Sequence, residues 1–152
     1  MSLKLESPEV IAGKQFEQDM QEWSRQLDAF AAGEQKTKDL IVGGTPDVLQ
    51  RLGFPDYPVI MQGKDVAKVL SDREDHCLPM EQLRVLPQAL WEPVMIFKSA
   101  SKTGAYTILT EIKNPVDKRN VMIALHHNVR SQRVRVNRIA SAYTRRPHWY
   151  VG

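Results

Sequence analysis

The stretch that decides the fold is residues 94–143, which read VMIFKSASKTGAYTILTEIKNPVDKRNVMIALHHNVRSQRVRVNRIASAY. Four of its segments are rich in β-branched and aromatic residues, as β-strands are: 94–98, 105–113, 121–126 and 134–143. Segments of turn-forming composition separate them, including His-Asn-Val-Arg-Ser-Gln at 127–132. The sequence therefore predicts four consecutive strands that join in meander order into an antiparallel sheet.

The first half of the chain favours helices. Apolar residues recur at three- and four-residue spacings from Val10 through Trp23 to Phe30, which predicts a helix over 8–32. Further predicted elements are helices at 45–52, 63–70, 79–86 and 86–90, a strand at 57–61, and a polar linker at 33–44. We expect an α+β fold, in which a helical N-terminal half packs on a four-stranded antiparallel sheet formed by the C-terminal half.

The predicted domain organisation divides the chain at residue 40. Residues 1–40 are expected to form an N-terminal helical extension and residues 41–152 an α+β domain. The helix in the extension has two interpretations: its apolar stripe covers the core, or it is a partner-docking or delivery segment of a larger polypeptide. Cys77 is the single cysteine, so no intrachain disulfide can form and a reducing compartment is indicated. No apolar run predicts a membrane span.

Charge is distributed unevenly along the chain. Residues 1–90 hold 10 Lys/Arg and 15 Asp/Glu, a net charge of −5, whereas residues 91–152 hold 11 and 3, a net charge of +8. Three of the four histidines lie in the cationic part. This asymmetry indicates a surface that meets a polyanion such as nucleic acid. A solvated basic face without a specific partner has the same composition, so both interpretations stay open.

The cationic part contains a strand of alternating arginines at residues 133–138. Period-two alternation predicts that Arg133, Arg135 and Asn137 lie on one face, with the intervening valines on the other. Since guanidinium groups match phosphate oxygens bidentately, we expect this polar face to bind substrate phosphates. An amphipathic strand with a solvated face is the alternative. The basic patch is expected to include three further arginines: Arg130, Arg145 and Arg146.

Several polar side chains of the predicted strands could carry chemistry. His126 ends the third strand, and histidine acts as a general acid or base near neutral pH. Glu111 is either a salt-bridge partner or a general base. Arg138 and Lys98 could stabilise negative charge, although a lysine at a strand end also commonly extends to solvent. Ser141 and Tyr143 share one face and could orient a phosphate, while a core strand is the plainer interpretation. Together these residues have the composition of a metal-independent ribonuclease, with no metal ligand set and no cofactor.

Five segments carry a resemblance to a known family: LGFPDYPVIM at 52–61, LPQALWEPVMIFKS at 86–99, LTEIK at 109–113, IALH at 123–126 and VNRIASAY at 136–143. They look like the C-terminal domain of phage MuF-type proteins, which is similar to the barnase, EndoU, colicin and RelE-like group of toxin nucleases. The resemblance covers residues 45–145. It implies a nuclease-like domain at 41–152, with an RNA-cleaving site on the exposed face of its sheet.

Our leading hypothesis is a metal-independent endoribonuclease toxin domain that cleaves RNA, with tRNA as one candidate substrate. The six catalytic candidates have the following expected roles: His126 as general acid or base, Glu111 as its partner, Lys98 and Arg138 as stabilisers of the phosphorane, and Ser141 and Tyr143 as phosphate-positioning groups. The expected site of action is the cytoplasm, after delivery into a target cell. An acidic immunity protein is the expected protein partner.

Two other classes of function fit parts of the sequence. The first is a non-catalytic phage- or secretion-associated module, whose basic face binds nucleic acid or an acidic partner protein. The second is a transferase, for example one that ADP-ribosylates a macromolecule. The sequence lacks the Arg…Ser-Thr-Ser…Glu-x-Glu set of such transferases, which counts against this class. Salt-sensitive binding without turnover would distinguish the binding module from the ribonuclease.

Overall fold

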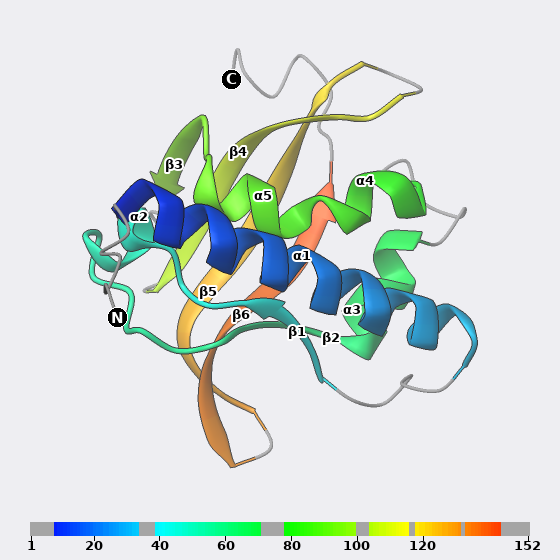
Figure 1. Cartoon of the computed structure of the whole chain (residues 1–152), viewed down its shortest axis with the longest axis horizontal. Helices are drawn as coiled ribbons and strands as arrows, with labels where there is room; N and C mark the ends of the chain where they lie inside the picture. Colours follow the sequence, from blue (N-terminus) through cyan, green and yellow to red (C-terminus); the bar gives the residue numbers. More distant parts are fainter. Residues whose placement is uncertain are drawn as a thin grey trace, which may run out of the picture.

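The computed structural model describes residues 8–33, 39–70, 78–99, 104–115, 118–131 and 133–143. In this part of the chain the element order is α1 (Pro8–Ala31), β1 (Asp39–Gly43), α2 (Asp47–Gln50), β2 (Val59–Gln62), α3 (Gly63–Leu70), α4 (Met80–Arg84), α5 (Leu86–Trp91), β3 (Met95–Lys98), β4 (Ala105–Lys113), β5 (Asn120–Ser131) and β6 (Val134–Tyr143) (Figure 1). The predicted mixture of helices and strands is confirmed, and most of these elements lie where the sequence predicts them.

The described strands form one six-stranded sheet in the order β1-β2-β6-β5-β4-β3. Strands β3 to β6 pair antiparallel in the predicted meander. The prediction of a four-stranded antiparallel sheet is confirmed only in part, because β1 and β2 extend these four strands to a larger sheet and β2 runs parallel to β6. The burial of Val59, Ile60 and Met61 explains this position, since a strand in the interior of a sheet buries both its faces.

The segment predicted as a linker at 33–44 contains β1. Leu40 and Val42 are fully buried and Ile41 between them is exposed, which is the alternation of a half-buried strand. Five residues are too few for this period to stand out from a polar background. The first half of the chain therefore supplies strands as well as helices.

The third predicted strand is longer than expected. The sequence predicts that it ends at His126, with a turn at 127–132, but β5 continues to Ser131. Its pairing with β6 shifts register between His126 and Val129, and Asn128 has a φ of 55°. This irregularity is a β-bulge, which absorbs extra residues while the two strands continue beyond it. Polar residues that read as a turn therefore belong to a long β-hairpin.

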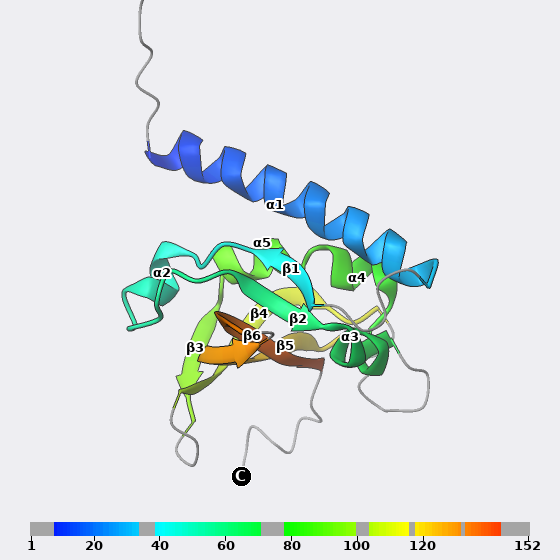
Figure 2. The same ribbon diagram turned by 90° about the horizontal axis from the view of Figure 1, so that it is seen from below.

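Helices α1, α4 and α5 pack on one face of the sheet. Figure 2 shows α1 lying across this side, over β1, α4 and α5, with the sheet beneath them. The core includes Leu83 and Leu90 from the helices and Ile108, Ile123 and Ile139 from the sheet. Helices on one side of a mostly antiparallel sheet are the expected architecture of an α+β domain.

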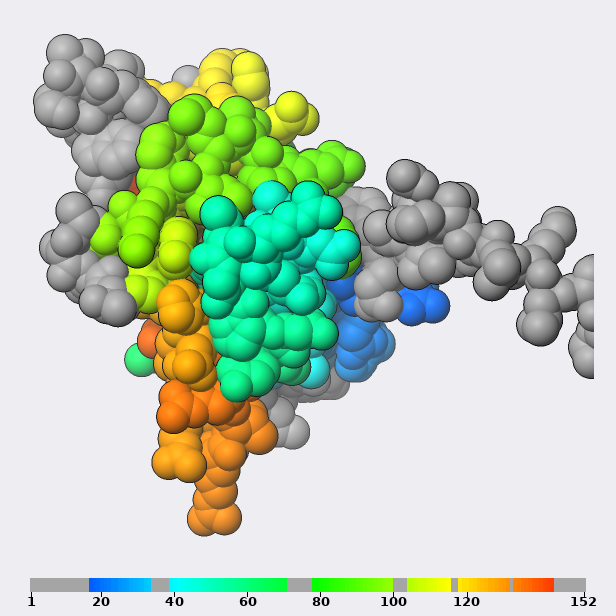
Figure 3. Space-filling model, turned by 90° about the vertical axis from the view of Figure 1, so that its left-hand side faces the viewer, coloured from blue at the N-terminus to red at the C-terminus, as the bar shows by residue number. Residues whose placement is uncertain are grey.

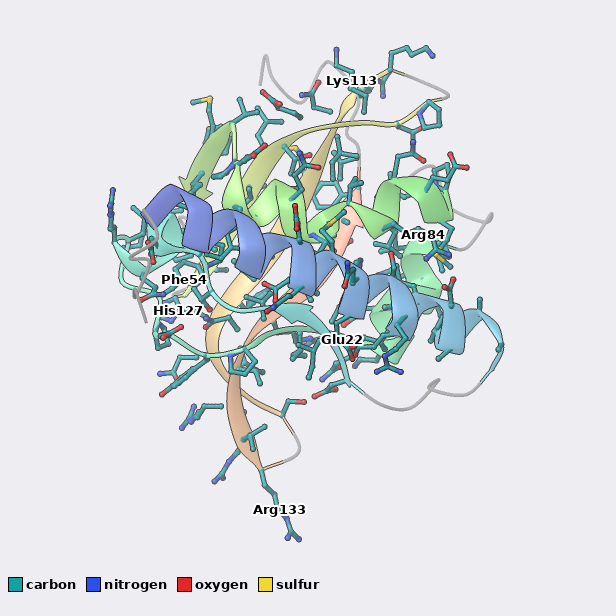
Figure 4. All side chains as sticks on the ribbon, in the orientation of Figure 1. Glu22, Phe54, Arg84, Lys113, His127 and Arg133 are labelled. Carbon is teal, nitrogen blue, oxygen red and sulfur yellow. The ribbon has the colours of Figure 1, made fainter. Side chains whose placement is uncertain are left out.

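Helix α1 is part of this core. Trp23 and Leu27 are fully buried, and the Trp23 indole Nε1 donates a hydrogen bond of 2.7 Å to the Leu83 carbonyl oxygen in α4. On its solvent side, Arg25 donates hydrogen bonds of 3.0 and 2.5 Å to Glu22 (labelled in Figure 4), which lowers the pKa of that carboxyl group. The helix therefore covers the core, in line with the first interpretation of the extension. Whether residues 41–152 form a separate domain stays a prediction.

We predict that Trp23→Ala lowers the free energy of unfolding by about 3–5 kcal/mol, because it removes a fully buried aromatic side chain and its hydrogen bond. Urea unfolding followed by circular dichroism measures the change. Arg25→Ala on the solvent side of the same helix is the matched control, with an expected change within about 0.5 kcal/mol. Equal stability of the two variants would show that α1 is not an integral part of the core.

Candidate functional site

His126 and Arg138 lie side by side on one face of the sheet. They are directly paired across β5 and β6, and directly paired residues of antiparallel strands project to the same face. Their neighbours Leu125 and Ile139 are fully buried in the helix-covered core. Since successive side chains of a strand alternate between faces, His126 and Arg138 project to the side opposite α1, α4 and α5. We call this side the His126 face.

Two more predicted site residues belong to the His126 face. Ser141 is paired with Ala124, and Tyr143 with Met122, which lie two and four residues before His126 on β5. At a strand rise of about 3.3 Å per residue, the two positions are displaced from His126 by about 7 and 13 Å along the strand direction. The four polar residues therefore form a row along the paired strands. Ser141 and Tyr143 are both partly exposed.

Arg138 is held by a carboxylate from a helix. Its Nη2 donates a hydrogen bond of 2.8 Å to Asp65 Oδ2 in α3. The side chains are 25% and 11% exposed, so this ion pair is largely shielded from water. The Arg138 Nε is buried and has no hydrogen-bond partner in the described part of the chain. A buried donor without an acceptor costs free energy, and a bound anion that reached it would remove that cost.

Glu111 lies far from His126. Ala105 pairs with His126 at one end of β4, and Glu111 is six residues further along the strand, which corresponds to about 20 Å. Glu111 instead lines a cavity of about 270 Å³ against α5, together with Val85, Gln88, Ala89, Glu92 and Ile112. The structure does not bring the predicted His126–Glu111 pair together.

Lys98 lies on the helix-covered side of the sheet. It is paired with Tyr106 across β3 and β4, and Tyr106 packs against the core. Its neighbour Phe97 is paired with Thr107, which is in turn paired with Ala124 on the His126 face. Alternation therefore directs the exposed Lys98 side chain away from the His126 face, and the structure does not place it beside Arg138.

Asn137 is fully buried, so the expectation that it shares an exposed polar face with Arg133 and Arg135 is wrong. Its side-chain carbonyl accepts a hydrogen bond of 3.0 Å from the backbone N–H of Asn128, which fixes the bulge. Its amide nitrogen donates to Thr45 Oγ1 and to the Pro55 carbonyl, at 2.7 and 3.0 Å. Because these partners occupy the hydrogen-bonding groups of the buried amide, Asn137 has a structural role. It connects β6 to the bulge in β5 and to the loops on either side of α2.

The three arginines near the β5–β6 turn are exposed. Arg130 and Arg135 are directly paired across the hairpin, and Arg133 lies at its turn with a φ of 72°. Figure 3 shows that this hairpin extends beyond the rest of the molecule, and Figure 4 shows Arg133 directed outward at its end. We call Arg130, Arg133 and Arg135 the hairpin arginines. Arg145 and Arg146 lie outside the described residues.

The hairpin arginines are separate from the His126 face. Arg135 is three residues from Arg138 on β6, so alternation directs the two side chains to opposite faces. His126 and Arg133 are seven residues apart along the hairpin, which corresponds to about 20 Å. The basic patch inferred from the sequence is therefore divided between two locations.

His127, the second histidine of the pair, packs against aromatic side chains. The His127 ring lies 5.2 Å from the Phe54 ring and 6.0 Å from the Tyr106 ring, between centroids (Figure 4). Gly104 approaches it closely: a Cβ at this position would lie 3.3 Å from His127 Nε2, and the glycine has a φ of 80°. Adjacent histidines thus project to opposite sides of the sheet, as expected for neighbouring strand residues.

Two features of the site have no clear sequence signal. Asp65 lies in a helix that the sequence predicts, but nothing in the pattern of α3 indicates that it meets an arginine 73 positions later. The role of Asn137 depends on Thr45, which is 92 positions away. Within the described ranges, no group of three or more His, Cys, Asp and Glu side chains is placed to hold a metal ion. No helix in those ranges is long and apolar enough to cross a membrane.

We predict that Asn137→Ala lowers the free energy of unfolding by about 2–4 kcal/mol, because it leaves the Asn128 N–H, the Thr45 hydroxyl and the Pro55 carbonyl without their hydrogen bonds to a fully buried amide. Thermal and urea unfolding measure the loss, and the exposed Arg133→Ala is the control. Unchanged stability combined with weaker RNA binding would instead support the original substrate-binding interpretation.

Comparison with known proteins identifies the family. The family model of the phage MuF-C-terminal domain matches residues 67–151. The match begins within α3 and includes β3 to β6, and so all residues of the His126 face and the hairpin arginines. No curated protein and no solved structure gives a match. The further similarity to toxin nucleases stays a prediction. Because the matched segment covers more than half of the 152 residues, the chain belongs to the phage MuF C-terminal domain family.

Proposed function

We propose that this domain is a metal-independent endoribonuclease, which cleaves RNA at the His126 face. The observation that carries this proposal is the direct pairing of His126 with Arg138. A group that can transfer a proton lies beside a permanent cation, on the side of the sheet opposite α1, α4 and α5, where α3 contacts Arg138 through Asp65. Cleavage of RNA through its own 2′-hydroxyl needs both of these functions.

The chemistry assigns a role to each group. His126 accepts the proton of the 2′-hydroxyl, whose oxygen forms a bond to the adjacent phosphorus. The bond from phosphorus to the 5′-oxygen breaks, that oxygen takes up a proton from water, and a 2′,3′-cyclic phosphate remains. A positioned acid or base contributes about 10²–10⁴-fold to such a reaction. Arg138 stabilises the negative charge that develops on the phosphorane oxygens, and a preorganised donor of this kind contributes about 10²–10³-fold.

Asp65, Ser141 and Tyr143 complete the proposed site. Asp65 fixes the orientation of the Arg138 guanidinium through their ion pair, so that little conformational freedom is lost when a phosphate binds. The hydroxyl groups of Ser141 and Tyr143 lie further along the same row, where they contact phosphates that flank the scissile bond. Glu111 and Lys98 have no role in this proposal, because their positions on the sheet separate them from His126 and Arg138.

The biological setting is part of the same proposal. Such an enzyme acts in the cytoplasm, where RNA substrates such as tRNA are found, after delivery into a target cell as part of a larger polypeptide. An acidic immunity protein that covers the cationic hairpin would prevent RNA from binding. Membership of a phage protein family is consistent with this setting and does not itself assign an activity.

A second candidate function is RNA binding without catalysis, and the hairpin arginines favour it. Arg130 and Arg135 face each other as exposed like charges, which destabilises the free protein. A phosphate between their guanidinium groups would remove this repulsion through charge-assisted hydrogen bonds. This function requires only the hairpin, so it can be tested independently of the His126 face.

We predict that the purified chain cleaves total RNA in the presence of EDTA, and that His126→Ala lowers the cleavage rate by about 10²–10⁴-fold. His127→Gln is the matched control, because the neighbouring imidazole lies on the other side of the sheet, against Phe54. Gel electrophoresis of the RNA measures the rate, and circular dichroism verifies that each variant is folded. Intact RNA with the wild-type chain would contradict the enzymatic proposal.

We predict that loss of Arg138 abolishes most of the activity even when the protein stays folded. Arg138→Gln alone leaves the Asp65 carboxylate shielded without a partner, which costs stability. The double variant Asp65→Asn/Arg138→Gln removes both charges and keeps side chains of similar size. Its expected cleavage rate is about 10²–10³-fold below wild type. A folded double variant with the wild-type rate would exclude Arg138 as the group that stabilises the phosphorane.

We predict that Arg133→Ala and Arg135→Ala each weaken RNA binding and make the salt dependence of log K shallower by about 0.7–0.9 per lost phosphate contact. Fluorescence anisotropy of a labelled RNA over a range of salt concentrations measures both quantities. Arg84→Ala is the control, because Arg84 is paired with Asp28 on the helix side of the molecule. Identical salt slopes for all variants would exclude the hairpin arginines as phosphate ligands.

A further inference from the structure

The two edges of the sheet differ in how their backbone groups are covered. At the β1 edge, the Gln26 side chain of α1 donates a hydrogen bond of 2.8 Å to the Ile41 carbonyl oxygen and accepts one of 2.7 Å from the Ile41 N–H. An amide that binds both backbone groups of an edge residue takes the place of a neighbouring strand. Proteins protect edge strands in such ways, because an unpaired edge is a template for further strands.

The β3 edge has no such cover in the described part of the chain, where the sheet order ends at β3. All four residues of β3 are paired with β4 on one side. The N–H of Ser99 donates to the Ala105 carbonyl, so the antiparallel pattern turns the N–H and C=O groups of Ile96 and Lys98 outward. The neighbouring side chains are apolar and exposed: Val94 by 47%, Met95 by 53% and Phe97 by 41%.

We propose that β3 pairs in antiparallel fashion with β3 of a second copy of this chain, about a two-fold axis at Ile96, to form a continuous sheet across a homodimer. In this register the N–H and C=O groups of Ile96 bond to those of Ile96 in the second copy. The outward N–H and C=O groups of Lys98 lie at the two ends of the contact, opposite Val94 of the second copy, whose own N–H is bound to the Leu109 carbonyl. Met95 of each copy lies opposite Phe97 of the other copy, so this pair occurs twice. Thioether–aromatic contacts of this kind are favourable.

Charge complementarity identifies the occupant as a second copy. Glu92 and Lys98 are both exposed and flank the apolar segment with opposite charges. In the proposed register Lys98 lies opposite Val94 of the second copy, and Glu92, at the C-terminal end of α5, is two residues before that Val94. The long Lys98 side chain forms an ion pair with this Glu92 in the proposed dimer. The two-fold axis generates this ion pair twice, and a lysine that otherwise discourages edge pairing becomes part of the contact.

Sedimentation equilibrium of the full chain over micromolar to millimolar concentrations tests the proposal. We expect a reversible monomer–dimer equilibrium. Met95→Lys places a charge in the apolar segment and should eliminate the dimer, whereas Ile41→Lys, an exposed apolar residue on the protected β1 edge, should leave it unchanged. A wild-type chain that is monomeric at every concentration would overturn the proposal, as would equal effects of the two variants.

A charge exchange tests the register. Glu92→Lys places two lysines near each other at both ends of the contact and should weaken dimerisation by about tenfold or more. The double variant Glu92→Lys/Lys98→Glu restores opposite charges and should recover wild-type dimerisation. Failure of the double variant to recover, with the fold intact by circular dichroism, would overturn the proposed register. Neither measurement depends on RNA, so the outcome is independent of the proposed function.

Discussion

The register between β5 and β6 is the constraint on which the rest of the site depends. A slip of one residue on either strand would move every side chain to the other face, and His126 would then no longer share a face with Arg138. The bulge at Asn128 and the shift near Ala140 let these long strands stay paired despite unequal numbers of residues. Asn137 fixes the first irregularity with its own side chain. A buried amide thus determines where a partly exposed imidazole lies.

Part of this arrangement follows from sequence patterns. The α1 stripe, the four C-terminal strands and their antiparallel order rest on local periodicity and composition, and these signals are strong in segments such as 105–113. Ser141 and Tyr143 share one face by alternation alone, whereas their place on the same face as His126 and Arg138 depends on the register shift near Ala140. Strand β1 and the parallel pairing of β2 with β6 were missed, because they depend on contacts between segments that are distant in the chain.

The separation of candidate residues has the same origin. Strand composition shows that Glu111, Lys98 and His126 belong to one sheet, but distance along a strand and choice of face depend on the register, which composition does not contain. The prediction for Asn137 failed for a related reason. Arg133, Arg135 and Asn137 do alternate with valines in the sequence, but the bulge and the neighbouring loop bury Asn137. The charged hairpin and the His126 face are consequently two surfaces with different chemistry.

The bond between Trp23 and the Leu83 carbonyl has a consequence for how the chain acquires its fold. These residues are 60 positions apart, and Asn137 and Thr45 are 92 apart. During synthesis, α1 and β1 leave the ribosome well before β6 has been made. The early segments therefore cannot complete their contacts in the sheet until β6 is available. Topologies dominated by such distant pairings fold slowly, and the amphipathic face of α1 stays exposed to chaperones or to aggregation until the segments that cover it have been made.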